Sequence, residues 1–79
     1  MILFTLRSTS RQYDLDHPAA RSILREDLDL LGFFSNPGYA KYYSWFDQVY
    51  MPREMINELL WSIRLFDAAA TPDTERSVN

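Results

Sequence analysis

The chain has 79 residues, of which 47% are apolar and 15% aromatic, with no cysteine and a formal net charge of −3. A chain of this length forms one domain, and its apolar content is too high and its charge too small for a disordered protein. The lack of cysteine excludes a disulfide framework and thiolate metal sites, and the excess of acids over bases argues against direct binding of DNA or RNA.

The first apolar segment, residues 2–7, is typical of a β-strand. Ser8-Thr9-Ser10 is a polar break before a second short segment that starts at Gln12, so the pattern predicts a hairpin. If the second segment did not pair, the first strand would have no partner in the chain. It would then pair with a second copy or add to the sheet of a target.

The same N-terminal segment is too short and lacks the flanking residues of a signal peptide. No stretch of about 18 apolar residues occurs, so nothing in the sequence is long enough to span a membrane. We therefore expect a cytoplasmic protein without a membrane partner.

A first helix is predicted to begin at Asp16-His17-Pro18, with Asp16 or His17 as the cap and Pro18 in the first turn. Its apolar positions continue to about Leu31, and Gly32 is suited to the left-handed residue that ends a helix.

Asp27 falls within the apolar face of this helix. Because a buried, unpaired carboxylate is costly, we expect either a helix break at which Asp27 caps a second short turn, or an ion pair with an arginine. A polar specificity determinant at an interface is the alternative.

A second helix is predicted over Pro37–Tyr50, opened by Asn36 as its cap. Eight of the twelve aromatic residues fall between Phe33 and Tyr50, and those of the predicted helix share one face, with Trp45 at its flank. Aromatic residues at helical spacing are typical of a core, but rings are also enriched at interfaces. One helix cannot hide all of them, so we expect Trp45 or one of the tyrosines to reach the surface.

The last helix is predicted from Pro52 to about Ala69, with a kink or a tight corner before it. Trp61 and Leu65 lie one turn apart and point away from its main apolar face. Either this helix packs on both sides, or this pair is a docking face for a partner or a second copy. The main face consists of Met55, Ile56, Leu59, Leu60, Ile63 and Phe66.

Catalytic and metal-binding patterns are missing from the sequence. The only histidine, His17, precedes a proline at a helix start, and the cluster Asp14-Leu15-Asp16-His17 has no second group of ligands elsewhere. Asn36-Pro37-Gly38 has one glycine and reads as a turn, not a phosphate-binding loop. We expect no enzymatic activity, no cofactor and no metal.

The predicted fold is α+β and mainly helical. It has a short N-terminal strand or hairpin followed by three helices, the last two nearly contiguous around Pro52, with an all-α fold as the alternative. Residues 1–70 form the single small domain, and 71–79, which lack periodicity, form a flexible C-terminal tail.

The predicted function is stoichiometric binding to a protein partner, as an inhibitor or regulator of host machinery of the anti-defence type encoded by phages and mobile elements. An assembly subunit, or an antitoxin or immunity-type protein, in an obligate oligomer or complex is the first alternative, with a homodimer formed through the Trp61 and Leu65 face or the N-terminal strand. A small-molecule sensor with an aromatic pocket is the second. The candidate partner-binding residues are Trp61, Leu65, Trp45, Tyr39, Tyr42, Tyr43, Glu54 and Glu58.

Overall fold

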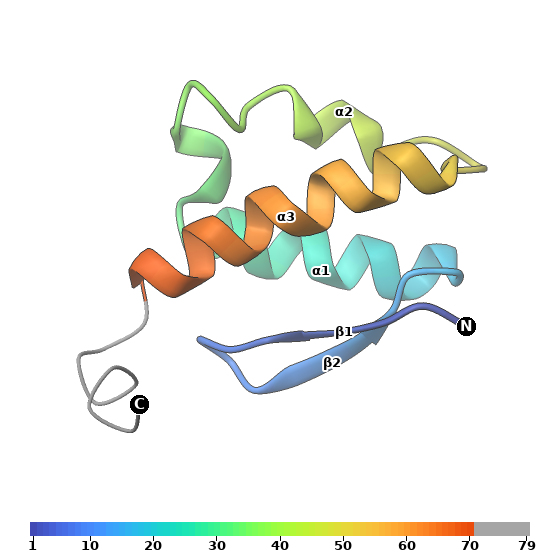
Figure 1. Cartoon of the computed structure of the whole chain (residues 1–79), viewed down its shortest axis with the longest axis horizontal. Coiled ribbons are helices and arrows are strands. Elements are labelled where there is room, and N and C mark those ends of the chain that lie inside the picture. The colour runs from blue at the N-terminus through green and yellow to red at the C-terminus, as the bar shows by residue number, and fades with distance from the viewer. Residues whose placement is uncertain (71–79) are drawn as a thin grey trace.

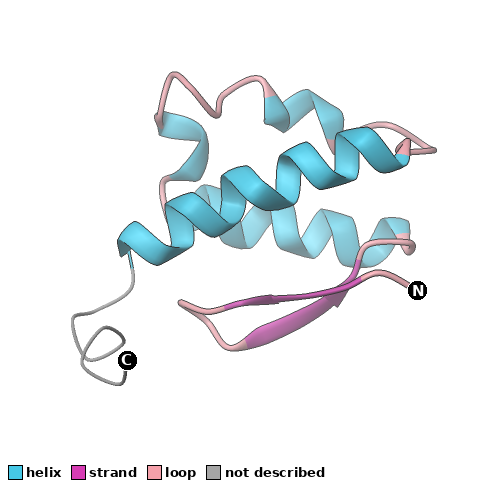
Figure 2. Cartoon of the chain, viewed as in Figure 1, coloured by secondary structure: helices cyan, strands magenta, loops and turns pink. Residues whose placement is uncertain are grey.

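The computed structural model describes residues 1–70, so the predicted tail over 71–79 lies outside the described residues. Helices α1 and α3 form the centre of the fold, with a β-hairpin along one side and the segment that carries η1 and α2 along the other (Figure 1). The predicted α+β, mainly helical class is confirmed (Figure 2). The elements are β1 (Leu3–Leu6), β2 (Arg11–Asp14), α1 (Pro18–Leu30), the 3-10 helix η1 (Phe33–Ser35), α2 (Tyr42–Trp45) and α3 (Arg53–Ala70).

The predicted hairpin is confirmed, and the alternative of one unpaired strand is wrong. β1 and β2 are antiparallel, with Phe4 opposite Tyr13. The backbone N–H groups of Thr9 and Ser10 donate to the carbonyl oxygen of Leu6 at 3.2 and 2.8 Å, and Ser10 has a left-handed φ of 61°. Alternation along the strands turns Phe4, Leu6 and Tyr13 into the core.

Helix α1 begins and ends where the sequence predicts. Pro18 is its first residue, and Gly32 beyond its end has a φ of 86°, which favours glycine. His17 occupies the N-cap position, but no side chain makes a capping hydrogen bond, so the prediction of a side-chain cap is wrong. The carboxylate of Asp16 instead lies 2.8 Å from the Met1 ammonium group.

Asp27 lies within an unbroken α1, so the predicted helix break is wrong and the predicted arginine pair is confirmed. The hydroxyl of Tyr13 donates to the Asp27 carboxylate, and the Arg11 guanidinium lies 3.6 Å from it. Burial, and then the hydrogen bond to Asp27, raise the pKa of Tyr13. The carboxylate on the apolar face therefore joins α1 to the hairpin.

The predicted helix over Pro37–Tyr50 is wrong, because this segment forms tight turns and the short α2. The Asn36 side chain accepts a hydrogen bond from the Gly38 N–H at 2.8 Å, which fixes a turn after Pro37. Between Tyr42 and Gln48, five N–H groups donate to the carbonyl three residues earlier, among them Tyr42 to Tyr39 at 3.0 Å. Glycine and tyrosine have lower helix propensity than alanine, so this segment has little intrinsic tendency to form a helix. Its conformation is therefore set by tertiary packing.

Ring packing on Phe33 accounts for this departure from a straight helix. The Phe33 ring is fully buried and stacks on Tyr39 with centroids 4.7 Å apart and planes 10° apart. Tyr42 lies 6.2 Å away in a stacked arrangement, and Phe66 of α3 meets Phe33 edge-on at 5.2 Å. The turns bring both tyrosines onto one buried ring, which adds about 0.5–1.5 kcal/mol per pair beyond area burial.

Helix α3 buries the main face that the sequence predicts, with Ile56, Leu59, Leu60 and Ile63 in the core. The loop before α3 is held by Arg21 of α1, a buried residue that the sequence analysis did not single out. Its guanidinium donates to the carbonyl oxygens of Leu15 at 2.8 Å, Gln48 at 3.3 Å and Val49 at 3.1 Å. One arginine therefore ties α1 to both the hairpin and this loop.

Candidate binding surface

Trp61 and Leu65 form an exposed apolar pair on α3, with 63% and 65% of their surfaces accessible. This exposure excludes the alternative in which α3 packs on both sides. Beside them on β1 lies Leu3, which is 48% exposed, and between the helix and the strand runs an open groove of about 430 Å³. The groove is lined by Leu3, Phe4, Thr5, Arg7, Trp61, Arg64, Leu65, Asp67 and Ala68.

The polar wall of this groove is the outer edge of β1. In an antiparallel pair, hydrogen-bonded and non-hydrogen-bonded residue pairs alternate. The Leu15 N–H donates to the Ile2 carbonyl at 2.8 Å, which makes Phe4 and Tyr13 the next hydrogen-bonded pair in the register. The backbone N–H and C=O groups of Leu3 and Thr5 consequently point away from β2.

Asp67 is part of the groove lining and ties the end of β1 to α3. Its side chain is only 1% exposed and accepts hydrogen bonds from the Arg7 N–H at 2.6 Å, the Ser8 N–H at 3.1 Å and the Ser8 hydroxyl. Hydrogen bonds to a buried carboxylate are among the stronger ones in proteins. The groove therefore lies between two elements that are fixed to each other.

The accessible charge along the groove is positive although the whole chain is acidic. The Arg64 guanidinium lies over the Trp61 ring, 5.3 Å from its centroid. Arg7 is the second cation of the lining, and Asp67, its one carboxylate, is buried. The groove thus presents an apolar face, a strand edge and the Arg64 guanidinium, which stacks on the Trp61 ring.

The predicted aromatic binding residues divide between core and surface. Tyr42 is 3% exposed, so its proposed role in partner contact is corrected to a core role. Tyr39 and Trp45 are half-buried and pack on Tyr42, with Trp45 edge-on at 4.7 Å. Tyr43 is exposed, as expected for one of the tyrosines, and carries Arg25 4.8 Å above its ring. Tyr43 is not part of this group of rings and meets Phe34 edge-on, with centroids 5.0 Å apart.

The two predicted acids lie outside the groove. Glu58 is 3.1 Å from the Lys41 ammonium and accepts a hydrogen bond from the Tyr42 hydroxyl at 3.0 Å. These two contacts lower the pKa of Glu58. Glu54 is exposed in the first turn of α3, where its negative charge interacts favourably with the positive end of the helix dipole. Neither acid is among the residues that line the groove, and along α3 Glu58 lies about one helical turn and Glu54 about two turns before Trp61.

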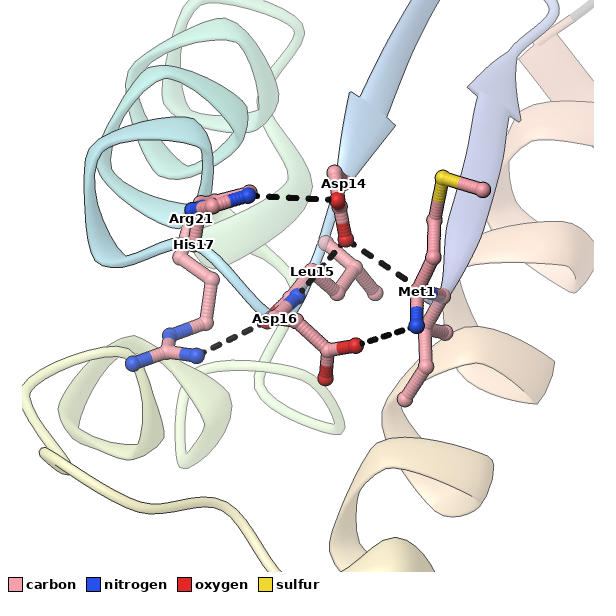
Figure 3. A network of polar contacts seen from close by, with 7 residues as sticks. Met1, Asp14, Leu15, Asp16, His17 and Arg21 are labelled. Carbon is pink, nitrogen blue, oxygen red and sulfur yellow. Dashed lines mark hydrogen bonds and ion pairs between the residues drawn. The ribbon is translucent and has the colours of Figure 1, made fainter.

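The acidic cluster before α1 also has a structural role (Figure 3). Asp14 accepts hydrogen bonds from the N–H groups of Ile2 at 3.3 Å and Asp16 at 3.1 Å, and its other oxygen lies 3.4 Å from His17. The hydrogen bond from Asp16 is the main cause of the lowered pKa of Asp14. In residues 1–70 no group of three or more potential ligands is placed to hold a metal ion. The cluster joins the chain start to the strand end.

Sequence reasoning found Trp61 and Leu65 but missed the rest of the groove. Asp67 lies one turn after the buried Ile63, so its position on the apolar face was a readable signal, of the same kind as Asp27. The edge residues Leu3 and Thr5 gave no such signal. Their importance depends on hairpin register and on the passage of α3 beside them.

No family model, curated protein or solved structure matches this chain. Across residues 1–70, no helix combines the length and apolar content needed to cross a membrane.

Proposed function

We propose that this protein acts by binding another protein, and that the groove between β1 and α3 is the contact surface. The observation that carries this proposal is the exposure of Trp61 and Leu65, side by side on a helix that is packed into the core on its other face. An exposed apolar pair of this kind is a cost in a monomer and an anchor in a complex.

The rigidity of the groove supports the same proposal. Trp61 and Leu65 project from α3, a helix of 18 residues, and Asp67 ties the opposing strand to it. Surfaces on fixed elements lose little conformational entropy when a partner binds. Such a surface is suited to recognition without rearrangement.

Within protein-binding functions we propose a stoichiometric inhibitor or regulator, of the kind that phages and mobile elements use against host machinery. The support is chemical. The carboxylates that could serve in catalysis each make contacts that tie elements of the fold together. These carboxylates are Asp14, Asp27, Asp67 and Glu58. Groups with these structural contacts are occupied in holding the fold, and an inhibitor needs only a surface.

The test is affinity capture from the native cell, with the full chain compared with Trp61→Ala/Leu65→Ser. We expect the double variant to lose the partner identified by mass spectrometry. Its stability should change by less than about 1 kcal/mol because both side chains are exposed. The matched control is Val49→Ala/Tyr50→Ser, which removes two exposed apolar side chains away from the groove and should keep the partner.

Retention of the partner by Trp61→Ala/Leu65→Ser would contradict the proposal. A large loss of stability in this variant would place the two side chains in the core instead. Size-exclusion chromatography with light scattering separates the assembly alternative, since an obligate oligomer would give a constant mass above that of the monomer at every concentration.

A further inference from the structure

We propose that the partner binds as an extended acidic segment that adds to the outer edge of β1 as a third strand. This inference rests on the proposed function for the place of contact, and it goes beyond it by specifying the backbone geometry and the charge of the partner.

The outer edge of β1 is unpaired in the part of the chain that the structure describes. The sheet has two strands, and in residues 1–70 no hydrogen bond from another element reaches the Leu3 or Thr5 backbone. Natural edge strands are usually protected by charge, proline or a bulge. β1 has the sequence Leu-Phe-Thr-Leu and none of these protections. Its outward N–H and C=O groups are therefore able to pair with another strand.

The groove beside this edge is bounded by β1 and α3. An added strand would lie about 4.8 Å from β1, and its side chains would alternate between the two faces of the sheet. Those on the Phe4 face would meet Trp61 and Leu65, while those on the Leu3 face would meet solvent. The groove therefore requires apolar residues at every second position of the segment.

The charge beside Trp61 favours an acidic partner. Arg64 is exposed beside the groove and stacks on Trp61, and within residues 1–70 no carboxylate pairs with it. Stacking leaves the edge of a guanidinium open to bidentate pairing with a carboxylate. A segment carrying Asp or Glu near Arg64 is thus complementary to the groove.

A second copy of this chain is a poorer occupant. A twofold interface would place two Arg64 side chains at one surface, and β1 has no carboxylate to offer them. The length of the segment is also limited, since β1 spans four residues and the Arg7 N–H just beyond them already donates to Asp67. At about 3.3 Å per residue this edge accommodates roughly four to six residues of added strand.

The test uses the full chain as bait for a displayed library of random octapeptides, followed by affinity measurement with the synthetic winner. We expect selected peptides to alternate apolar residues and to share one Asp or Glu. Thr5→Pro removes an outward N–H of β1 and should weaken binding by about tenfold, the value of one hydrogen bond with its strand geometry.

Gln12→Pro is the matched control for this variant. Thr5 and Gln12 are directly opposed in a non-hydrogen-bonded pair, so each N–H points outward from its own strand. Both prolines therefore leave the β1–β2 hydrogen bonds intact and impose the same ring on an edge strand. Gln12→Pro should bind the peptide like the wild type. Arg64→Glu should reverse the preference for acidic peptides, whereas Arg53→Glu, outside the groove, should not.

Hydrogen exchange provides a measurement that needs no proline variant to fold. Binding should slow exchange of the Leu3 and Thr5 amides by about tenfold or more and leave the Gln12 amide unchanged. Equal binding by Thr5→Pro and the wild type, with no protection at these amides, would overturn strand addition. A dimer that Thr5→Pro abolishes would identify a second copy as the occupant and would overturn the acidic segment.

The double variant Trp61→Ala/Leu65→Ser separates the two proposals in the same assay. If it loses the peptide while Thr5→Pro retains it, the groove remains the binding surface and strand addition fails. If every selected peptide binds both variants normally, or none is enriched, both the strand proposal and the groove as binding surface fail.

Discussion

Replacing Asp67 by Asn tests whether one carboxylate fixes the groove. Asp67 accepts hydrogen bonds from the Arg7 N–H, the Ser8 N–H and the Ser8 hydroxyl. Asn has nearly the same size, but its NH₂ group cannot accept a hydrogen bond and would face one of these donors. Hydrogen bonds to a charged group are worth about 1.5–3 kcal/mol each, and a buried group left unsatisfied costs about 1–3 kcal/mol. The loss of the charge and of at least one bond gives an expected destabilisation of about 3 kcal/mol.

This loss is large for a chain of this size, whose core supplies only about 3–5 kcal/mol. Urea denaturation followed by far-UV circular dichroism measures it as a fall in midpoint. Ser8→Ala is the matched control, because it removes the hydroxyl bond alone and should cost about 1 kcal/mol. A loss below about 0.5 kcal/mol for Asp67→Asn, or one equal to that of Ser8→Ala, would refute the reasoning.

Two further predictions concern the other buried and acidic groups. Arg21→Met leaves the carbonyls of Leu15, Gln48 and Val49 without their donor, so we expect a loss of about 2–4 kcal/mol in urea denaturation, and a wild-type midpoint would contradict it. For Asp14, whose pKa is lowered below its ordinary value of 3.8, the ionised form stabilises the fold above that value and this contribution is lost as the pH falls through the lowered pKa. Asp14→Asn should therefore flatten the acid side of the stability-against-pH curve, and an unchanged slope there would show that Asp14 makes no such contribution.

Element boundaries could be predicted where local chemistry decides them. Pro18 and Gly32 mark the ends of α1, and Ser8-Thr9-Ser10 marks the hairpin turn, because proline, glycine and short polar residues restrict the backbone without help from other segments. The segment over Pro37–Tyr50 could not be predicted in this way. Its turns satisfy contacts with Phe33, which lies outside it, so a helical repeat within the segment carried no information about them.

One wall of the groove could be predicted from the sequence, whereas the other depends on tertiary structure. Trp61 and Leu65 were visible because they depart from the helical repeat of α3, which is a property of the sequence itself. The β1 edge became visible only with the register, since a shift of one residue would turn the outward N–H groups of Leu3 and Thr5 toward β2. Asp67 connects the two walls. The Asp67 carboxylate, on the apolar face of α3, accepts hydrogen bonds from the Arg7 and Ser8 N–H groups just after β1. These hydrogen bonds hold the β1 edge beside Trp61. Asp67, which occupies a position where α3 would otherwise bury an apolar side chain, is therefore the residue that forms the groove.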